Sequence, residues 1–204
     1  MRESAFGTHP PPFDQPVDLD AHLAALPLGA SAKGLYLRDP VRRAEAARPG
    51  VDLFALADVP KRRLLPFFDY PYGELMRLLV AATGVIWPSL PQGEGMRRLG
   101  RGAYEALLSQ QVGRVIFAAF GNDFSRVAAV GARGWQVSVS FGSVRYVDLG
   151  PGHGAYRFRE FPAFLETYQV GVVEGAMSIC GVEGEVRTKL ENIGEGVLEF
   201  WWET

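Results

Sequence analysis

Residues 182–191 are Val-Glu-Gly-Glu-Val-Arg-Thr-Lys-Leu-Glu, and this stretch does more than any other to decide the fold class. Uncharged residues alternate strictly with charged ones along it. Such a period of two predicts a strand with one dry face and one solvated face. Residues 192–196 form a turn sequence, and residues 197–203, with Trp201 and Trp202, return as a last strand. The chain is therefore predicted to end in an antiparallel hairpin.

A second hairpin and a helix are predicted just before it. Residues 143–149 and 155–161 are β-prone runs that flank Gly150-Pro-Gly-His-Gly154, a loop rich in turn formers. Apolar residues at helical spacing follow over residues 164–180, and Gly181 ends that pattern. The second half of the chain thus has the predicted order β-β-α-β-β.

The first half has mostly helical patterns. Apolar residues recur at intervals of three and four, as on a helix with one buried face. We predict helices over residues 71–85, 99–119 and from Asp123 onward, a short helix ending at Leu26, a β-prone run at 33–37 and a helix over 40–48. The predicted fold class is α+β, with N-terminal helices packed on a small antiparallel sheet of β-β-α-β-β order.

The stretch Trp135-Gln-Val-Ser-Val-Ser-Phe141 fits two structures. Its alternation of apolar and polar residues favours a strand. Trp135 and Ser138 also continue the helical spacing of Phe124, Val127 and Gly131. Pattern alone leaves both alternatives open.

Two parts of the chain are predicted from composition. Residues 1–16 contain four prolines and few apolar groups, which is typical of a flexible, extended arm that is disordered or laid on a neighbour. Residues 17–204 are predicted to form a single α+β domain.

Composition excludes several classes of protein. Of 204 residues, 48% are hydrophobic and 22% charged, as in globular proteins. The net charge of −2 gives no indication of the basic surface that a nucleic-acid-binding protein needs. No apolar run approaches the ~20 residues needed for a membrane-spanning helix. A single cysteine excludes an internal disulfide and fits a cytoplasmic protein.

No catalytic or metal motif can be assembled from spacing. The three histidines lie outside any metal-ligand pattern, and Cys180 ends its helix, where the helix dipole disfavours a thiolate. The glycines of residues 93–102 precede no Gly-Lys-Ser/Thr signature and favour the ordinary start of a helix over a phosphate loop. We therefore expect no enzyme, and the sequence identifies no cofactor.

Aromatic residues make up 12% of the chain and include four tryptophans. They indicate either a large aromatic core or an apolar cavity that receives a small hydrophobic or planar ligand. Gly171 and Gly175, four residues apart on one helix, are expected to let that helix lie close to the sheet or to a second copy.

Several short motifs resemble those of a paralogous family of uncharacterised proteins of about 200 residues, best known from myxobacteria. The resemblance covers roughly residues 30–202 and implies no activity or catalytic residue. Its motifs are Lys33-Gly-Leu-Tyr-Leu37, Leu99-Gly-Arg101, Val112-Gly-Arg114, Phe141-Gly142, Leu149-Gly-Pro-Gly-His153 and Gly171-Val-Val-Glu-Gly175.

The order of elements is also similar to a superfamily that joins the haem nitric-oxide-binding domains, the vinyl-reductase-like ligand domains and the transport-particle subunits of vesicle trafficking. This likeness implies an α+β fold with an internal apolar pocket, and it implies that residues 135–141 finish a helix. No histidine lies on a helix expected to face the pocket, so the likeness does not extend to an axial haem ligand.

The first functional hypothesis is a non-catalytic cytoplasmic regulatory module, expected to be a homodimer, that binds a small hydrophobic or planar ligand in an internal pocket. Arg114 is the candidate for orienting a polar end of the ligand, because an arginine beside a dry helix face needs an anionic partner. The alternative is an adaptor that binds a protein partner and has a packed core without a ligand. The predicted ligand-binding residues are Phe117, Trp135, Tyr146, Trp202 and Arg114.

Overall fold

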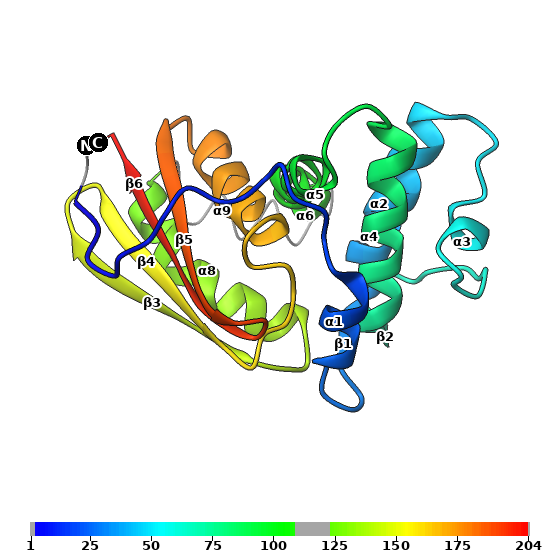
Figure 1. The fold of residues 1–204 in the computed structure, drawn as a ribbon, viewed down its shortest axis with the longest axis horizontal. Helices are drawn as coiled ribbons and strands as arrows, with labels where there is room; N and C mark the ends of the chain where they lie inside the picture. Colours follow the sequence, from blue (N-terminus) through cyan, green and yellow to red (C-terminus); the bar gives the residue numbers. More distant parts are fainter. Residues whose placement is uncertain (1–2, 109–122, 204) are drawn as a thin grey trace.

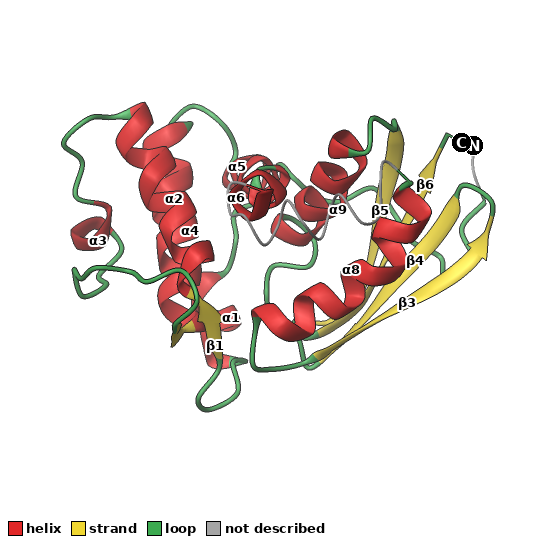
Figure 2. Ribbon diagram, turned by 180° about the vertical axis from the view of Figure 1, so that it is seen from behind, coloured by secondary structure: helices red, strands yellow, loops and turns green. Residues whose placement is uncertain are grey.

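The structure is a computed structural model and describes residues 3–108 and 123–203 of the chain. A four-stranded sheet with two helices on one face forms one side of the molecule, and a group of N-terminal helices forms the other (Figure 1). Seen from behind, helices α8 and α9 cover the sheet, and α5 and α6 lie between the two groups (Figure 2). The predicted α+β class is confirmed.

All strands of the main sheet are antiparallel to their neighbours. The sheet order is β3-β4-β6-β5, so the last strand of the chain lies inside the sheet. Val186 pairs with Phe200, and Tyr146 pairs with Tyr156. The strands are β3 (Ser143–Gly150), β4 (His153–Arg159), β5 (Gly184–Asn192) and β6 (Glu195–Trp202), which confirms the two predicted hairpins.

The two faces of the sheet differ in what covers them. Phe200 and Trp202 of β6 contact Phe124 of α8, so they belong to the inner face. The predicted dry face of residues 182–191 is only partly dry, because Val186 and Thr188 are buried whereas Leu190, near the end of β5, is 41% exposed.

Residues 4–9 of the predicted arm lie on the molecule's own sheet, whereas Phe13 lies against residues 93–97 and accepts a hydrogen bond from the amide of Glu94. His9 exchanges two backbone hydrogen bonds of 2.8 Å with Thr188 of β5. The fully buried carboxylate of Glu199 accepts hydrogen bonds from Ser4 (2.5 Å), Thr8 (2.6 Å) and the amide of Ala5 (2.8 Å). The arm therefore covers the outer face of the sheet, as the dark blue segment of Figure 1 shows.

Helices α1 and α4 begin and end close to their predicted positions, whereas α2 is an exception and α3 was not predicted. Asp18 caps α1 through a 3.0 Å bond from the amide of Ala21, and α4 fits the prediction for residues 71–85. The elements are α1 (Leu19–Ala24), β1 (Ser31–Lys33), α2 (Gly34–Ala47), α3 (Leu53–Leu56), β2 (Asp69–Pro71) and α4 (Tyr72–Ile86).

The exception is α2, which corrects the β-prone prediction for residues 33–37. The strand ends at Lys33, and the helix begins at Gly34, so that Pro40 lies inside it instead of in its first turn. The amides of Gly34 and Leu35 donate to the carbonyls of Phe68 and Pro66. Carbonyl groups distant in sequence thus accept hydrogen bonds from the amides of the first turn of the helix. No local sequence pattern predicts these contacts.

The predicted helix over residues 99–119 is also different in the structure. Helix α5 (Gln92–Arg101) begins seven residues earlier, and α6 (Ala103–Leu108) follows after a break at Gly102. A Cβ atom at Gly102 would lie 1.4 Å from the guanidinium of Arg43, which shows how close the two groups come. The remainder of that prediction falls outside the described residues.

Helix α8 (Phe124–Ser138) settles the alternatives for residues 135–141. Asp123 caps its start by accepting a hydrogen bond from the amide of Arg126. The helix continues to Ser138, and Val139 then forms an isolated bridge with Ala32. The helical spacing is therefore the correct interpretation up to Ser138.

Helix α9 (Tyr168–Ile179) crosses α5 at backbone contact. A Cβ atom at Gly171 would lie 2.0 Å from the carbonyl oxygen of Arg97, and one at Gly175 would lie 2.3 Å from that of Arg101. A Cβ atom at Gly100 of α5 would in turn lie 2.0 Å from the carbonyl oxygen of Tyr168. The two glycines of α9 therefore serve a contact with α5, not the contact with the sheet or a second copy that the sequence suggested.

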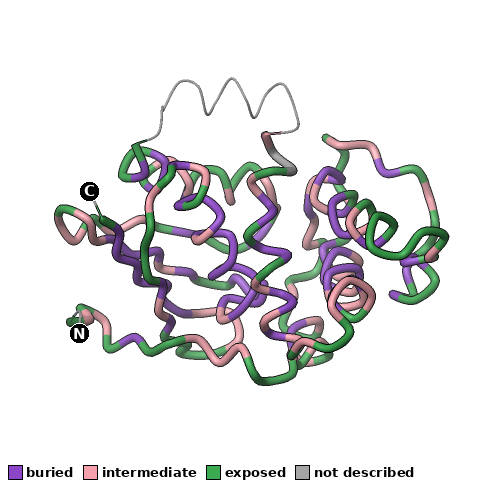
Figure 3. The backbone as a smooth tube through the Cα atoms, turned by 90° about the horizontal axis from the view of Figure 1, so that it is seen from above, coloured by how far each residue is buried: buried purple, intermediate pink, exposed green. Residues whose placement is uncertain are grey.

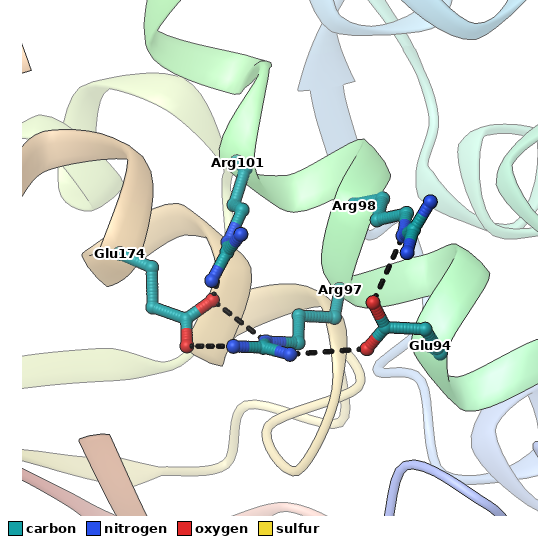
Figure 4. Close-up of polar contacts among 5 residues, drawn as sticks. All are labelled: Glu94, Arg97, Arg98, Arg101 and Glu174. Atoms are coloured by element: carbon teal, nitrogen blue, oxygen red, sulfur yellow. Dashed lines mark hydrogen bonds and ion pairs between the residues drawn. The ribbon is translucent and has the colours of Figure 1, made fainter. Parts of the chain in front are cut away.

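Five charged side chains form a network of ion pairs beside the crossing of α5 and α9 (Figure 4). Arg97 donates two hydrogen bonds to Glu174 of α9, at 2.8 and 2.7 Å, and Arg101 donates a third at 2.7 Å. Glu94 accepts from Arg97 (3.1 Å) and from Arg98 (2.9 Å). The network fixes the relative position of α5 and α9.

The core extends through both halves of the molecule (Figure 3). Its largest fully buried side chains include Phe158, Phe161, Phe164 and Phe200. Among the helices of residues 3–108 and 123–203, none has both the length and the apolar character needed to cross a membrane.

Gly171→Ala tests the helix crossing. The new methyl group would overlap the Arg97 carbonyl, so the free energy of unfolding should fall by about 1–3 kcal/mol in urea titration. Gly84→Ala is the matched control, because nothing lies within 4 Å of a Cβ atom there. That variant should be neutral or more stable by up to about 1 kcal/mol. Equal effects of the two substitutions would contradict the close crossing.

Glu199→Gln tests the contact between the arm and the sheet. Burial raises the pKa of Glu199, but hydrogen bonds from Ser4, Thr8 and the Ala5 amide outweigh it and hold the pKa below its usual 4.5. The stabilisation by this carboxylate is thus complete above pH 4.5 and is lost as the pH falls through the lower, folded-state pKa.

At pH 7 the free energy of unfolding of the variant should be about 1–3 kcal/mol lower than that of the unsubstituted protein. This difference should shrink as the pH drops below 4.5. Urea titrations at several pH values measure this. Glu185→Gln, on the neighbouring strand, removes an exposed ion pair with Arg187 and should cost at most about 1 kcal/mol. If the loss of unfolding free energy caused by Glu199→Gln does not change with pH, the ionised Glu199 carboxylate does not hold the arm on the sheet.

Candidate functional site

An apolar cavity of about 200 Å³ lies between the N-terminal helices and the helices that cover the sheet. Aromatic, aliphatic and glycine residues make up most of its wall. The cavity is lined by Tyr36, Tyr72, Leu75, Ala103, Tyr104, Val127, Val130, Gly131, Gly134, Trp135, Val137, Ser138, Val139, Phe161, Tyr168, Gln169 and Val172.

Helix α8 forms the largest part of the wall, because its second half combines small residues with one large ring. Nothing lies within 4 Å of a Cβ atom built at Gly134. Val137, near the end of the helix, is 74% exposed, so the lining reaches the surface at this end. The small residues at these positions leave space that larger side chains would fill.

Trp135 is held in place on this wall by hydrogen bonds and ring contacts. Its Nε1 donates to Oε1 of Gln169 at 2.9 Å, and Nε2 of Gln169 donates to the carbonyl of Ala163 at 3.1 Å. Its ring meets Tyr156 edge-on, with centroids 4.9 Å apart, and Phe158 at 5.7 Å. Gln169 is only 2% exposed, so this pair is fixed inside the protein.

Tyr36 and Ser138 form a second polar pair at the wall. Their hydroxyl oxygens are 2.7 Å apart, and Ser138 Oγ also lies 2.6 Å from the carbonyl oxygen of Gly134. Burial raises the pKa of Tyr36, although the hydrogen bond with Ser138 opposes the shift. Both hydroxyls are thus satisfied within the protein.

Tyr72 and Tyr168 present hydroxyls of a different kind. The two residues are 3% and 8% exposed, and neither hydroxyl has a hydrogen-bond partner in the described part of the chain. The fully enclosed polar atoms without a partner belong to other residues, so these two oxygens face accessible space. Leaving a buried hydroxyl without a partner costs about 1–3 kcal/mol.

Both phenols stay protonated. Burial raises the pKa of Tyr72, and the neighbouring phenol of Tyr36 adds to the shift. Burial likewise raises the pKa of Tyr168, with Tyr72 as the next largest cause. Near neutral pH each hydroxyl is therefore available as a hydrogen-bond donor.

The predicted ligand-binding residues are not gathered at this cavity. Trp135 lines it. Tyr146 instead packs against Tyr156 and Phe200 on the inner face of the sheet, and Trp202 packs against Phe124 and Phe200. Arg114 and Phe117 lie outside the described residues.

Sequence reasoning missed the tyrosines of the wall. Tyr72 has the same apolar spacing as the core residues of α4, and Tyr168 fits the apolar pattern of α9 in the same way. No sequence signal separates them from the core positions, because Tyr168 lies inside the predicted helical pattern of residues 164–180 and becomes the first residue of α9 only in the structure.

The other candidates for chemistry do not line the cavity. His153 Nε2 lies 2.9 Å from Glu199, and His22 Nε2 lies 3.4 Å from Glu166. Burial raises the pKa of the Cys180 thiol, with Asp123 adding to the shift, as expected of an unreactive core residue. The described residues include no group of three or more His, Cys, Asp or Glu that could hold a metal ion.

Solved structures define the class of fold. An H-NOX protein from S. oneidensis, in an Fe(II)NO ligation state, superposes with a TM-score of 0.66 at 14% identity, over 84% of this chain and 99% of that one. A variant of the T. Tengcongensis H-NOX protein matches with a TM-score of 0.64 at 11% identity, over 84% and 98% of the two chains. The Fe(II) unliganded H-NOX protein from K. algicida gives 0.63 at 9% identity, over 84% and 97%. The chain has an H-NOX-like fold.

The family is defined by sequence. Residues 41–202 match the model of the DUF2378 family, described as proteins of unknown function, and the chain belongs to that family. No curated protein sequence matches it.

The described lining does not fit haem. Haem iron takes histidine, cysteine, methionine or tyrosinate as its axial ligand. The cavity wall includes no histidine, cysteine or methionine among the described residues, and burial disfavours ionisation of Tyr72 and Tyr168. Residues 109–122 contain none of these four residue types. The volume of about 200 Å³ is also below the roughly 300–1,000 Å³ of pockets for drug-sized ligands, and haem is larger than those.

Gln169→Leu tests the support of Trp135. The substitution leaves the indole N–H and the Ala163 carbonyl without partners, so the free energy of unfolding should fall by about 2–4 kcal/mol. Urea denaturation, followed by tryptophan fluorescence, measures the loss. Gln136→Leu, at the exposed residue next to Trp135, should change stability by less than about 0.5 kcal/mol. A similar small change for both variants would show that the hydrogen bonds to Gln169 do not hold the ring.

Proposed function

We propose that this chain is a regulatory module, without catalysis, that binds a small hydrophobic or planar ligand in the cavity beside α8. The observation that carries the proposal is the wall itself. It combines apolar and aromatic side chains with a few fixed polar groups, the usual composition of small-molecule sites. A space of this kind is uncommon in a close-packed core, and an apolar cavity of similar size can take up a small apolar molecule.

The H-NOX-like fold supports a regulatory role by analogy. The S. oneidensis relative carries nitric oxide on iron(II). Because identity is only 14%, the likeness supports a ligand-binding role for the fold and not the identity of the ligand.

We also propose that the module works in the cytoplasm as a homodimer. Cys180 is a free, buried thiol, which suits a reducing compartment. Phe67 and Phe68 are 58% and 63% exposed and offer apolar surface for a second copy.

The same two phenylalanines favour the second candidate function, an adaptor that binds a protein partner. Adjacent exposed aromatic rings are the type of residue that anchors protein interfaces. An adaptor would need no cavity, whereas the ligand-binding module depends on one, so occupancy of the cavity separates the two functions.

Native and denaturing mass spectrometry of the purified protein tests the proposal. A non-covalent mass should be present on the native protein and absent after denaturation. Trp135→Phe removes the indole N–H and part of the wall, so the variant should retain much less of that mass. It should still fold, with a loss of about 1–3 kcal/mol in unfolding free energy.

Trp202→Phe is the matched control, because that ring is buried but does not line the cavity. It should keep the bound mass. An empty native protein that also takes up none of the small aromatic probes described below would refute the ligand-binding function and leave the adaptor in its place.

A further inference from the structure

The hydroxyls of Tyr72 and Tyr168 are the unexplained polar groups of the cavity. Each is the first residue of its helix, α4 or α9, and each is more than nine-tenths buried. Both rings line the same cavity. Their hydroxyls have no hydrogen-bond partner among the described residues, and together they form a polar spot on the wall.

The other polar groups described on the wall are already engaged. Tyr36 is bonded to Ser138, and Trp135 is bonded to Gln169, whose amide nitrogen is bonded in turn to Ala163. Tyr104 also has a partner. The polar spot at Tyr72 and Tyr168 is thus left for a ligand.

We propose that the cavity binds a small, neutral, planar molecule whose carbonyl-type oxygen accepts hydrogen bonds from Tyr72 and Tyr168. This inference rests on the proposed ligand-binding function and specifies the chemistry of the ligand. A carbonyl oxygen has two lone pairs and can accept from both hydroxyls at once.

The absence of charge on the described wall selects a neutral ligand. No Lys, Arg, His, Asp or Glu is among the described residues that line the cavity, and the two charged groups that act on Tyr168 from behind the wall, Asp39 and Arg43, are paired with each other at 2.8 Å. A carboxylate placed there would lose its hydration without gaining a counter-charge, which is strongly unfavourable. A neutral carbonyl needs only the two donors that are present.

Size and shape limit the ligand further. An apolar cavity of about 150 Å³ in another protein binds benzene. The present cavity of about 200 Å³ therefore suits a single substituted aromatic ring. The aromatic side chains of the wall, Trp135 and Phe161 among them, favour a planar face.

Three probes of nearly equal shape test the inference: acetophenone, α-methylstyrene and benzoate. Acetophenone has the carbonyl acceptor, α-methylstyrene replaces it with a carbon–carbon double bond, and benzoate carries a negative charge. Isothermal titration calorimetry of the full chain should give the tightest binding for acetophenone. α-Methylstyrene should bind about fivefold to tenfold more weakly, and benzoate more weakly still.

Tyr72→Phe and Tyr168→Phe remove one hydroxyl each and keep the ring. Each variant should weaken acetophenone binding by about threefold to tenfold and leave α-methylstyrene binding nearly unchanged. Tyr146→Phe is the control, because Tyr146 does not line the cavity, and it should change neither affinity. Circular dichroism of the variants verifies that each one is folded.

The outcomes separate this inference from the proposed function. Equal binding of acetophenone and α-methylstyrene, unchanged in both tyrosine variants, would overturn the inference while the cavity remains a ligand site. Tightest binding of benzoate would overturn the neutral ligand and direct attention to a cation outside the described wall. Binding of none of the probes, together with an empty native protein, would remove the proposed function itself.

Discussion

The backbone contact between α5 and α9 is the constraint on which the rest of the structure depends. Glycines on both helices remove the side chains that would hold them apart, so carbonyl groups of one helix fill the positions of Cβ atoms on the other. Helix α9 also packs on the sheet side, and α5 packs on α4, so this one crossing joins the two halves of the molecule. The cavity lies beside that junction. Tyr168, Gln169 and Val172 of α9 line it, so the crossing positions this part of its wall.

Local patterns in the sequence predict the sheet well and the N-terminal half less well. The alternation in residues 182–191 and the turn residues 150–154 act over short distances, so both hairpins could be predicted. The start of α2 at Gly34 depends on carbonyls more than thirty residues away, and the arm depends on Glu199 almost two hundred residues away. Trp135 could be predicted as a site residue because a large ring at the end of an amphipathic helix is conspicuous. The hydroxyls of Tyr72 and Tyr168 could not, because an apolar pattern does not show which ring atoms lack a partner.

The H-NOX-like fold and the chemistry of the cavity are separable. The S. oneidensis H-NOX protein of similar fold is in an Fe(II)NO ligation state, whereas the described wall here carries protonated phenols, an indole and an amide. A fold of this kind provides a protected space between two packed halves, and the side chains that face the space determine what enters it. Membership of the DUF2378 family does not add a known activity, so the wall residues carry the functional argument.

The position of the arm has a consequence for the order of events during folding. Residues 4–8 bind the carboxylate of Glu199, which lies about 190 residues further along the chain. Until β6 joins the sheet, Glu199 is not in place for the arm, and the edge of β5 that pairs with β6 has no partner. Unpaired strands of this kind are open to pairing with other chains. The closed arm thus distinguishes a fully folded molecule from a partly folded one, since the arm is held at Glu199 only after β6 has joined the sheet.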